Sequence, residues 1–131
     1  MRIYVTVSFG DSKEDVERLC SLARAAGFED FCFVRDVEHY QKIFDNPKDL
    51  MRSSCDEVAK SDGLLIDMTD KPTGRAIEAG MAYALGKRIV AIMKKGTQIK
   101  DTTRGIADAI IEYDAIDDIL PGLTTALQDW Q

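Results

Sequence analysis

Glu78 is the acidic side chain whose position most favours chemistry. It lies about one helical turn after the start of a helix that the apolar spacing places near Thr73. A turn-rich loop, residues 68–74, joins this helix to a short apolar strand at residues 63–66. In open α/β sheets, ligands bind where the carboxyl end of a strand leads into a helix. A carboxylate there can stabilise positive charge or attack an electrophilic carbon, and the helix N-terminus favours its charged form by about 0.3–1 kcal/mol.

Two further carboxylates lie in the same stretch. Asp67 ends the strand, at the edge where a ligand pocket is expected, and Asp70 lies in the loop. Asp67 either binds hydroxyl groups of a ligand or caps the loop, and the sequence leaves both interpretations open. No rival catalytic motif is present, because His39 is the only histidine and the glycines form neither a Walker nor a Rossmann pattern.

Apolar and β-branched segments predict the elements that must position these groups. The predicted strands are residues 2–8, 31–34, 63–66, 88–93 and 109–113. The predicted helices begin near Ser12, Pro47, Thr73 and Pro121. Residues 35–45 are predicted to form either a short helix or a lid, and residues 98–107 a polar connection between strands.

This alternation of strands with helices predicts one α/β domain spanning residues 1–131. The expected architecture is a doubly wound, five-stranded parallel sheet with helices on both faces. Its expected strand order is 2-1-3-4-5, as in flavodoxin- or Rossmann-like folds.

The composition limits the kinds of partner. The net charge of −6 argues against nucleic acid, because binding to phosphate backbones depends on clustered Lys and Arg. The three cysteines are scattered without metal-ligand spacing, so we expect no bound metal. The sequence has no long apolar span and no signal-peptide pattern, and we expect a reduced, cytoplasmic protein that does not bind membranes.

The motif around Glu78 resembles a known enzyme family. The matching residues, in order, are Tyr4 in the first strand, then Asp62, Thr69, Gly74, Glu78-Ala79-Gly80 and Gly86-Lys87. This pattern is similar to that of the nucleoside 2-deoxyribosyltransferases and of their relatives, the deoxynucleoside 5′-monophosphate N-glycosidases. The fold that this resemblance implies is the same doubly wound sheet.

The resemblance implies a mechanism for cleaving an N-glycosidic bond. Glu78 would attack the anomeric carbon of a (deoxy)nucleoside or its 5′-monophosphate, and the Tyr4 hydroxyl would orient it. The sugar would then pass to another base or to water. No cofactor is needed, and the protein is expected to form a homodimer or higher oligomer with sites shared between subunits.

The resemblance also implies residues that contact the substrate. They are Ser8, Ser54, Asp67, Asp70, Thr73 and Gly74, together with Lys100, Thr102 and Thr103, which could reach a neighbouring subunit's site.

The sequence differs from the family pattern in three places. The loop after the first strand is Phe9-Gly10-Asp11, where the N-glycosidases have an arginine. Ser54 stands where the family has an aspartate that helps to protonate the leaving base, and Pro72 stands where the family contacts the 5′-group. Asp67, Asp70 or water would then assist departure of the base, and Asp70 or Thr73 would contact the 5′-group.

These differences leave two alternatives open. The first is a nucleotide-binding module that retains the pocket without catalysis. The second is a nucleoside-phosphate phosphoribohydrolase of the lysine-decarboxylase-like type, in which a glutamate at a glycine-containing helix start is also used.

Overall fold

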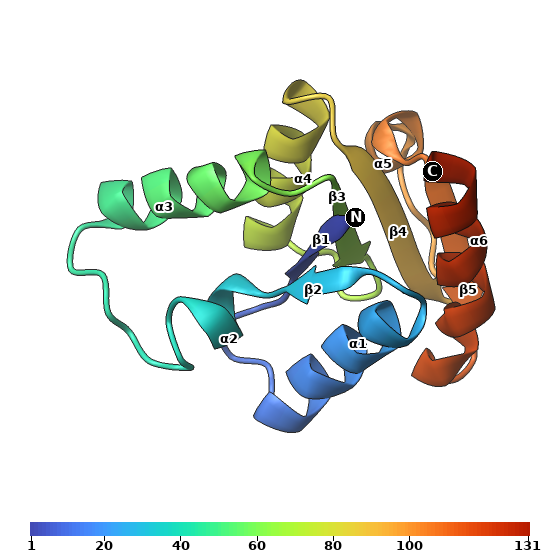
Figure 1. The fold of residues 1–131 in the computed structure, drawn as a ribbon, viewed down its shortest axis with the longest axis horizontal. Coiled ribbons are helices and arrows are strands. Elements are labelled where there is room, and N and C mark those ends of the chain that lie inside the picture. The colour runs from blue at the N-terminus through green and yellow to red at the C-terminus, as the bar shows by residue number, and fades with distance from the viewer.

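The sheet has the predicted topology. The computed structural model describes residues 1–131 and contains one five-stranded parallel sheet in the order β2-β1-β3-β4-β5 (Figure 1). The strands are β1 (Arg2–Thr6), β2 (Glu29–Phe31), β3 (Gly63–Asp67), β4 (Arg88–Lys94) and β5 (Ala109–Tyr113). The helices are α1 (Lys13–Ala25), α2 (Phe33–Asp36), α3 (Pro47–Ala59), α4 (Gly74–Ala84), α5 (Asp101–Ile106) and α6 (Leu120–Trp130), with a 3-10 helix η1 (Ile116–Ile119) before α6. The predicted α/β fold class is confirmed.

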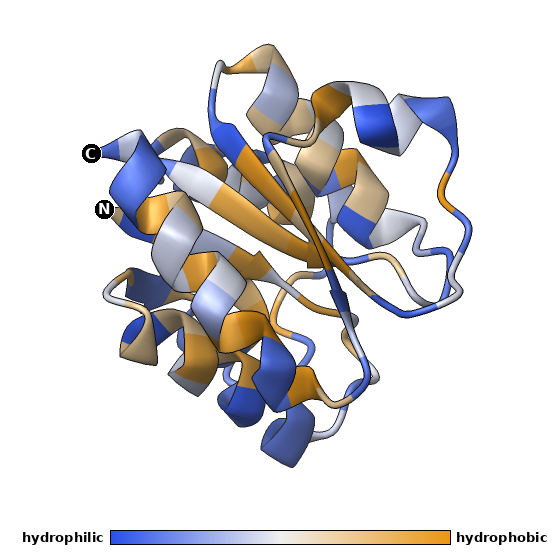
Figure 2. Cartoon of the chain, turned by 90° about the vertical axis from the view of Figure 1, so that its right-hand side faces the viewer, coloured by the Kyte–Doolittle hydropathy of each residue, from blue (hydrophilic) through white to orange (hydrophobic).

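Helices cover both faces of the sheet, because successive strand residues bury their side chains on alternate faces. Val5 and Leu65 belong to the hydrophobic cluster that α1 and α6 cover. Leu64 and Ile66 belong to the cluster on the other face, which α3, α4 and α5 cover. Figure 2 shows the central strands as hydrophobic segments lying between helices that carry hydrophilic residues.

The starts of α1 and α3 follow the predicted capping chemistry. The Ser12 side chain accepts a hydrogen bond from the backbone N–H of Asp15 at 3.1 Å. The Asn46 side chain accepts one from the N–H of Lys48 at 3.0 Å, and Pro47 occupies the first turn of α3.

The second strand is shorter than the sequence predicts. It ends at Phe31, and Phe33 and Val34 lie in α2 instead of continuing the strand. Both side chains are buried, but they join the hydrophobic clusters on opposite sides of the sheet. A buried one-turn helix and a buried strand give the same short apolar run, which explains the error.

The connection between β4 and β5 also differs, since residues 101–106 form the short helix α5 within the predicted polar segment.

The buried face of α4 is not the one predicted. The helical spacing of Ile77, Met81, Ala84 and Leu85 in the sequence predicts that these residues face the core, but Ile77 and Leu85 are 58% and 46% exposed. Ala79 and Ala82 are buried in their place. Small side chains allow the helix to lie close to the sheet, so the larger apolar residues are left on its outer surface.

A ligand is expected to bind at the carboxyl ends of β1 and β3. These strands pair in parallel, with Thr6 opposite Ile66. The chain leaving β1 enters α1 on one face, whereas the chain leaving β3 enters α4 on the other. Such a switch of faces opens a crevice at the carboxyl ends of the strands. None of the helices has the length and apolar character needed to cross a membrane.

Candidate active site

Three hydroxyl groups donate hydrogen bonds to the carboxylate of Glu78. Thr6 Oγ1 donates to Oε1 at 2.8 Å, Ser54 Oγ donates to Oε2 at 2.7 Å, and the Tyr4 hydroxyl also donates to Oε2. The hydroxyl oxygens of Tyr4 and Ser54 are 3.2 Å apart. Because both carboxylate oxygens are held, Glu78 has a fixed orientation, and hydrogen bonds to a charged acceptor are among the stronger ones.

Three elements bring these groups together. Tyr4 and Thr6 are two residues apart in β1, so their side chains point to the same face of the sheet. Ser54 lies on the buried face of α3, and Glu78 lies in the second turn of α4. Packing of α3 against α4 over β1 therefore builds the cluster.

Tyr4 is a neutral hydrogen-bond donor at physiological pH. Its side chain is buried, with 1% of the residue exposed. Burial, followed by the negative charge of Glu78, raises the pKa of the Tyr4 hydroxyl well above its ordinary value. The hydroxyl can therefore orient Glu78 but does not act as a base.

A cavity of about 540 Å³ opens beside the Glu78 carboxylate. This volume is within the range of small-molecule binding sites. The cavity combines apolar and polar walls: it is lined by Tyr4, Val5, Thr6, Val7, Ser8, Phe9, Phe33, Val34, Glu38, Lys42, Phe44, Asp45, Pro47, Leu50, Met51, Ser54, Thr73, Gly74, Arg75, Ile77 and Glu78. Of the residues predicted to contact substrate, it includes Ser8, Ser54, Thr73 and Gly74.

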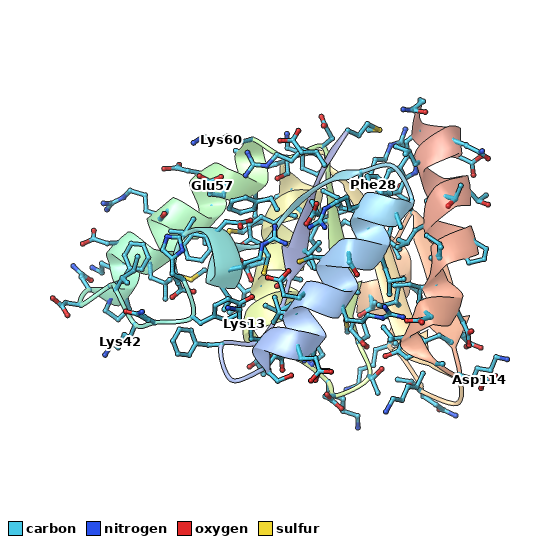
Figure 3. All side chains as sticks on the ribbon, turned by 60° about the horizontal axis from the view of Figure 1, so that its bottom comes forward. Lys13, Phe28, Lys42, Glu57, Lys60 and Asp114 are labelled. Carbon is cyan, nitrogen blue, oxygen red and sulfur yellow. The ribbon has the colours of Figure 1, made fainter.

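Lys42 and Arg75 are the cations of this cavity. Lys42 lies on the segment that joins α2 to α3 (Figure 3). Arg75 lies in the first turn of α4, where its Nη1 donates a hydrogen bond to the carbonyl of Asp67 at 2.9 Å. The Nε atom of Arg75 is buried and has no hydrogen-bond partner within the chain.

Asp67 and Asp70 line a second, smaller cavity instead of the one that holds Glu78. Asp67 accepts hydrogen bonds from the N–H of Thr69 at 2.9 Å, from the Thr69 hydroxyl at 2.6 Å and from the Tyr113 hydroxyl at 2.5 Å. Burial, followed by the bond to Asp67, raises the pKa of Tyr113 to about 12. Asp67 thus caps the loop after β3, which corrects the expectation that it faces the Glu78 pocket.

Lys100, Thr102 and Thr103 line neither cavity. They lie at the start of α5, in the connection from β4 to β5. Their predicted contact with a substrate therefore requires a second subunit.

Sequence reasoning missed Thr6, Glu38 and Arg75. The alternation Tyr4-x-Thr6 in a strand could have placed Thr6 beside Tyr4. Glu38 had no comparable signal, because it lies outside any regular element, in a segment whose conformation the sequence did not specify. The sequence predicts that Ser54 contacts the substrate, but in the structure its hydroxyl donates a hydrogen bond to Glu78.

Solved structures of nucleoside-processing enzymes share this fold. The CMP N-glycosidase BcmB of Clostridium botulinum aligns over 94% of this chain and 98% of its own, with a TM-score of 0.67 and 19% identity. A 2-deoxyribosyltransferase from Bacillus psychrosaccharolyticus aligns over 92% of this chain and 90% of its own, with a TM-score of 0.70 and 19% identity. Both are of the kind that the sequence motif resembles.

The fold alone does not specify an activity. A signal receiver domain from Vibrio parahaemolyticus aligns over 98% of this chain and 95% of its own, with a TM-score of 0.55 and 12% identity. No family model and no curated protein sequence matches the chain. An assignment of function therefore depends on the residues around Glu78.

Proposed function

We propose that this protein cleaves the N-glycosidic bond of a nucleoside or its 5′-monophosphate through a covalent intermediate on Glu78. The observation that carries the proposal is the Glu78 carboxylate, held by the hydroxyls of Tyr4, Thr6 and Ser54 at the wall of a ligand-sized cavity. All three donors are buried, so they fix the carboxylate at the cavity wall instead of leaving it mobile in solvent. The likeness of fold to an N-glycosidase and a deoxyribosyltransferase supports the same reaction class.

Cleavage of this bond leaves positive charge at the anomeric carbon. Glu78 would attack that carbon, and the glycosidic electron pair would leave with the base. A second nucleophile, water or another base, would then attack the same carbon and release Glu78. The hydroxyl donors keep the attacking oxygen in place, which lowers the entropic cost of reaching the transition state.

The cavity walls suit the two ends of a nucleotide. Phe9 and Phe44 offer aromatic surface on which a base can stack, and Phe9 is 53% exposed. Arg75 and Lys42 offer positive charge at the cavity wall, which attracts an anionic group. These cations favour the 5′-monophosphate over the free nucleoside.

The test is a chromatographic assay of base release from deoxynucleosides and their 5′-monophosphates, with and without a second free base. We expect release by the wild-type protein and none above background by Glu78→Gln. Exchange of bases would identify a transferase, and release without exchange a hydrolase. Nucleotide binding without turnover would contradict the proposal and favour a binding module.

A further inference from the structure

Glu38 is a buried carboxyl group that faces the same cavity as Glu78. Only 7% of the residue is exposed. No hydrogen bond or ion pair from the protein influences its carboxyl group. The only fully buried side-chain polar atom without a partner is Arg75 Nε, so the Glu38 oxygens open onto the cavity, where a ligand can reach them.

The backbone holds Glu38 in this position. The N–H groups of Val37 and Glu38 both donate to the carbonyl of Phe33 at 3.0 Å, and the N–H of Tyr40 donates to the carbonyl of Val34 at 2.9 Å. His39 and Tyr40 then adopt left-handed conformations, with φ of 50° and 60°. Two successive non-glycine residues in this region are costly and are found mainly where the surrounding structure requires them, often at functional sites.

Contacts of Tyr40 keep this turn in place. Its hydroxyl donates to Glu17 at 3.2 Å, its ring lies 5.5 Å from the Lys13 ammonium, and its side chain packs on the α1 side of the core. These contacts of Tyr40 fix the turn to α1. They therefore keep Glu38, two residues earlier, at the cavity.

The surroundings of Glu38 favour its protonated form. Burial, followed by the negative charge of Glu78, raises the pKa of the Glu38 carboxyl group. The other ionisable groups lining the cavity are Tyr4, Lys42, Asp45, Arg75 and Glu78. Of the acids among them, Asp45 is exposed, and the carboxylate of Glu78 already accepts three hydroxyl donors. Two carboxyl groups with different environments in one site are the arrangement of a nucleophile and an acid.

We propose that Glu38 is the acid that protonates the leaving base and then the base that activates the acceptor, an inference that rests on the proposed function. In the first step a Glu78 oxygen bonds to the anomeric carbon while the bond from that carbon to the base breaks. The Glu38 proton passes to the base, which leaves neutral. In the second step Glu38 takes a proton from water, the water oxygen bonds to the anomeric carbon, and the bond to Glu78 breaks.

This assignment supplies the proton source that Ser54 cannot provide. The Ser54 hydroxyl is committed to Glu78, and a hydroxyl group is a far weaker acid than a carboxyl group. Asp67 and Asp70, which the sequence offered for this role, line the other cavity.

The test compares two leaving groups in Glu38→Gln. 2′-Deoxyguanosine 5′-monophosphate needs a proton on its base, whereas its 7-methyl derivative already carries a positive charge and leaves without one. In single-turnover measurements of base release, which report the first step alone, we expect Glu38→Gln to lose about 100-fold or more with the first substrate, within the range of general acid catalysis, and less than threefold with the second. In the wild type, the rate of base release should fall with rising pH as Glu38 loses its proton. This decrease should be absent in Glu38→Gln. Glu38→Asp should restore part of the activity.

The controls separate this inference from the proposed function. Glu29→Gln changes an exposed glutamate of β2, and it should behave as wild type with both substrates. Equal losses in the rate of base release with both substrates in Glu38→Gln, or no loss with either, would overturn the role of Glu38 while leaving that of Glu78 intact. Selective loss in Asp45→Asn instead of Glu38→Gln would move the role to Asp45. Failure of the wild-type protein to cleave either substrate would contradict the proposed function itself.

Discussion

At the scale of single residues, the site depends on hydroxyl groups directed at one carboxylate. The contact between Glu78 and Tyr4 could be predicted from the sequence, because their order and spacing match a known motif. Thr6 and Glu38 could not be identified in the same way. A threonine in a strand is common, and the position of Glu38 depends on a left-handed turn at His39 and Tyr40 that no local residue preference specifies.

Removal of the Tyr4 hydroxyl should slow the reaction without unfolding the protein. Tyr4→Phe keeps the buried ring and deletes one donor to Glu78. We expect kcat to fall about 10- to 100-fold, because a hydrogen bond to a charged group contributes about 1.5–3 kcal/mol. Steady-state kinetics of base release measure this change. Tyr83→Phe, which alters an exposed tyrosine of α4, is the matched control, and an equal loss there would argue against a specific role for Tyr4.

Arg75 should distinguish phosphorylated from unphosphorylated substrates. Arg75→Met removes a positive charge from the cavity wall. We expect KM for a nucleoside 5′-monophosphate to rise about tenfold or more, equivalent to about 1.4 kcal/mol, with little change for the free nucleoside. Arg52→Met, at an exposed position of α3, controls for loss of a charge. Equal effects on both substrates would contradict a contact with the phosphate.

At the scale of elements, ion pairs join β2 to α1 and α2 and so position the turn that carries Glu38. Asp30 in β2 accepts hydrogen bonds from Arg24 and Arg35, all at 2.9 Å. Burial alone would raise the pKa of Asp30, but the hydrogen bonds from Arg24 and Arg35 outweigh it and lower the pKa below its ordinary value.

This shift predicts a pH dependence of stability. Because the folded-state pKa of Asp30 lies below the unfolded value of about 3.9, its contribution is fully present above that pH and is lost as the pH falls through the folded value. We expect Asp30→Asn to lower the free energy of unfolding at pH 7 by about 1 kcal/mol, since Arg24 is exposed and water screens its charge.

Urea denaturation of the wild type and Asp30→Asn at several pH values provides the measurement. The difference in unfolding free energy between the two proteins should decrease below about pH 4. Glu29→Gln, one residue earlier on β2, should show no difference at any pH. If the difference in unfolding free energy between the wild type and Asp30→Asn stays constant down to pH 2, the carboxylate charge is not the cause of that difference.

The sequence predicted elements best where one physical signal dominated. The caps at Ser12 and Asn46 located the starts of α1 and α3, and apolar runs located β3, β4 and β5. The edges of the fold were less predictable. At β2 and α2 the short apolar run fits either a strand or a helix, and only tertiary packing decides between the two.

At the scale of the whole molecule, α4 leaves large apolar side chains on the outer surface. Tyr83 and Leu85, at the C-terminal end of α4, are 57% and 46% exposed, whereas Ile77, which is 58% exposed, borders the cavity beside Glu78. Exposed apolar and aromatic residues on one helix favour a protein–protein interface. Trp130 does not belong to this surface, because it packs on the core beside Phe28, with ring centroids 6.0 Å apart.

We expect the protein to form a homodimer through the outer face of α4. Introducing a charge by Tyr83→Asp or Leu85→Asp should shift it toward monomers, because a charge is costly to bury in an apolar interface. Gln128→Asp, at an exposed position of α6, should leave the oligomeric state unchanged. Sedimentation equilibrium measures the molecular mass, and a wild-type monomer at working concentrations would rule out the dimer and any contact of Lys100 with a neighbouring site.

The most direct test of the central claim is to trap the glycosyl–enzyme intermediate. A 2′-fluoro-substituted 7-methylguanine nucleoside or its 5′-monophosphate should accumulate the intermediate, because fluorine slows both steps by destabilising positive charge at the anomeric carbon, whereas the cationic leaving group speeds the first step alone. Mass spectrometry of the intact protein, followed by peptide mapping, should then find one sugar adduct on Glu78 in the wild type and none in Glu78→Gln. Base release without an adduct on Glu78, or an adduct on another residue, would contradict a covalent mechanism through Glu78.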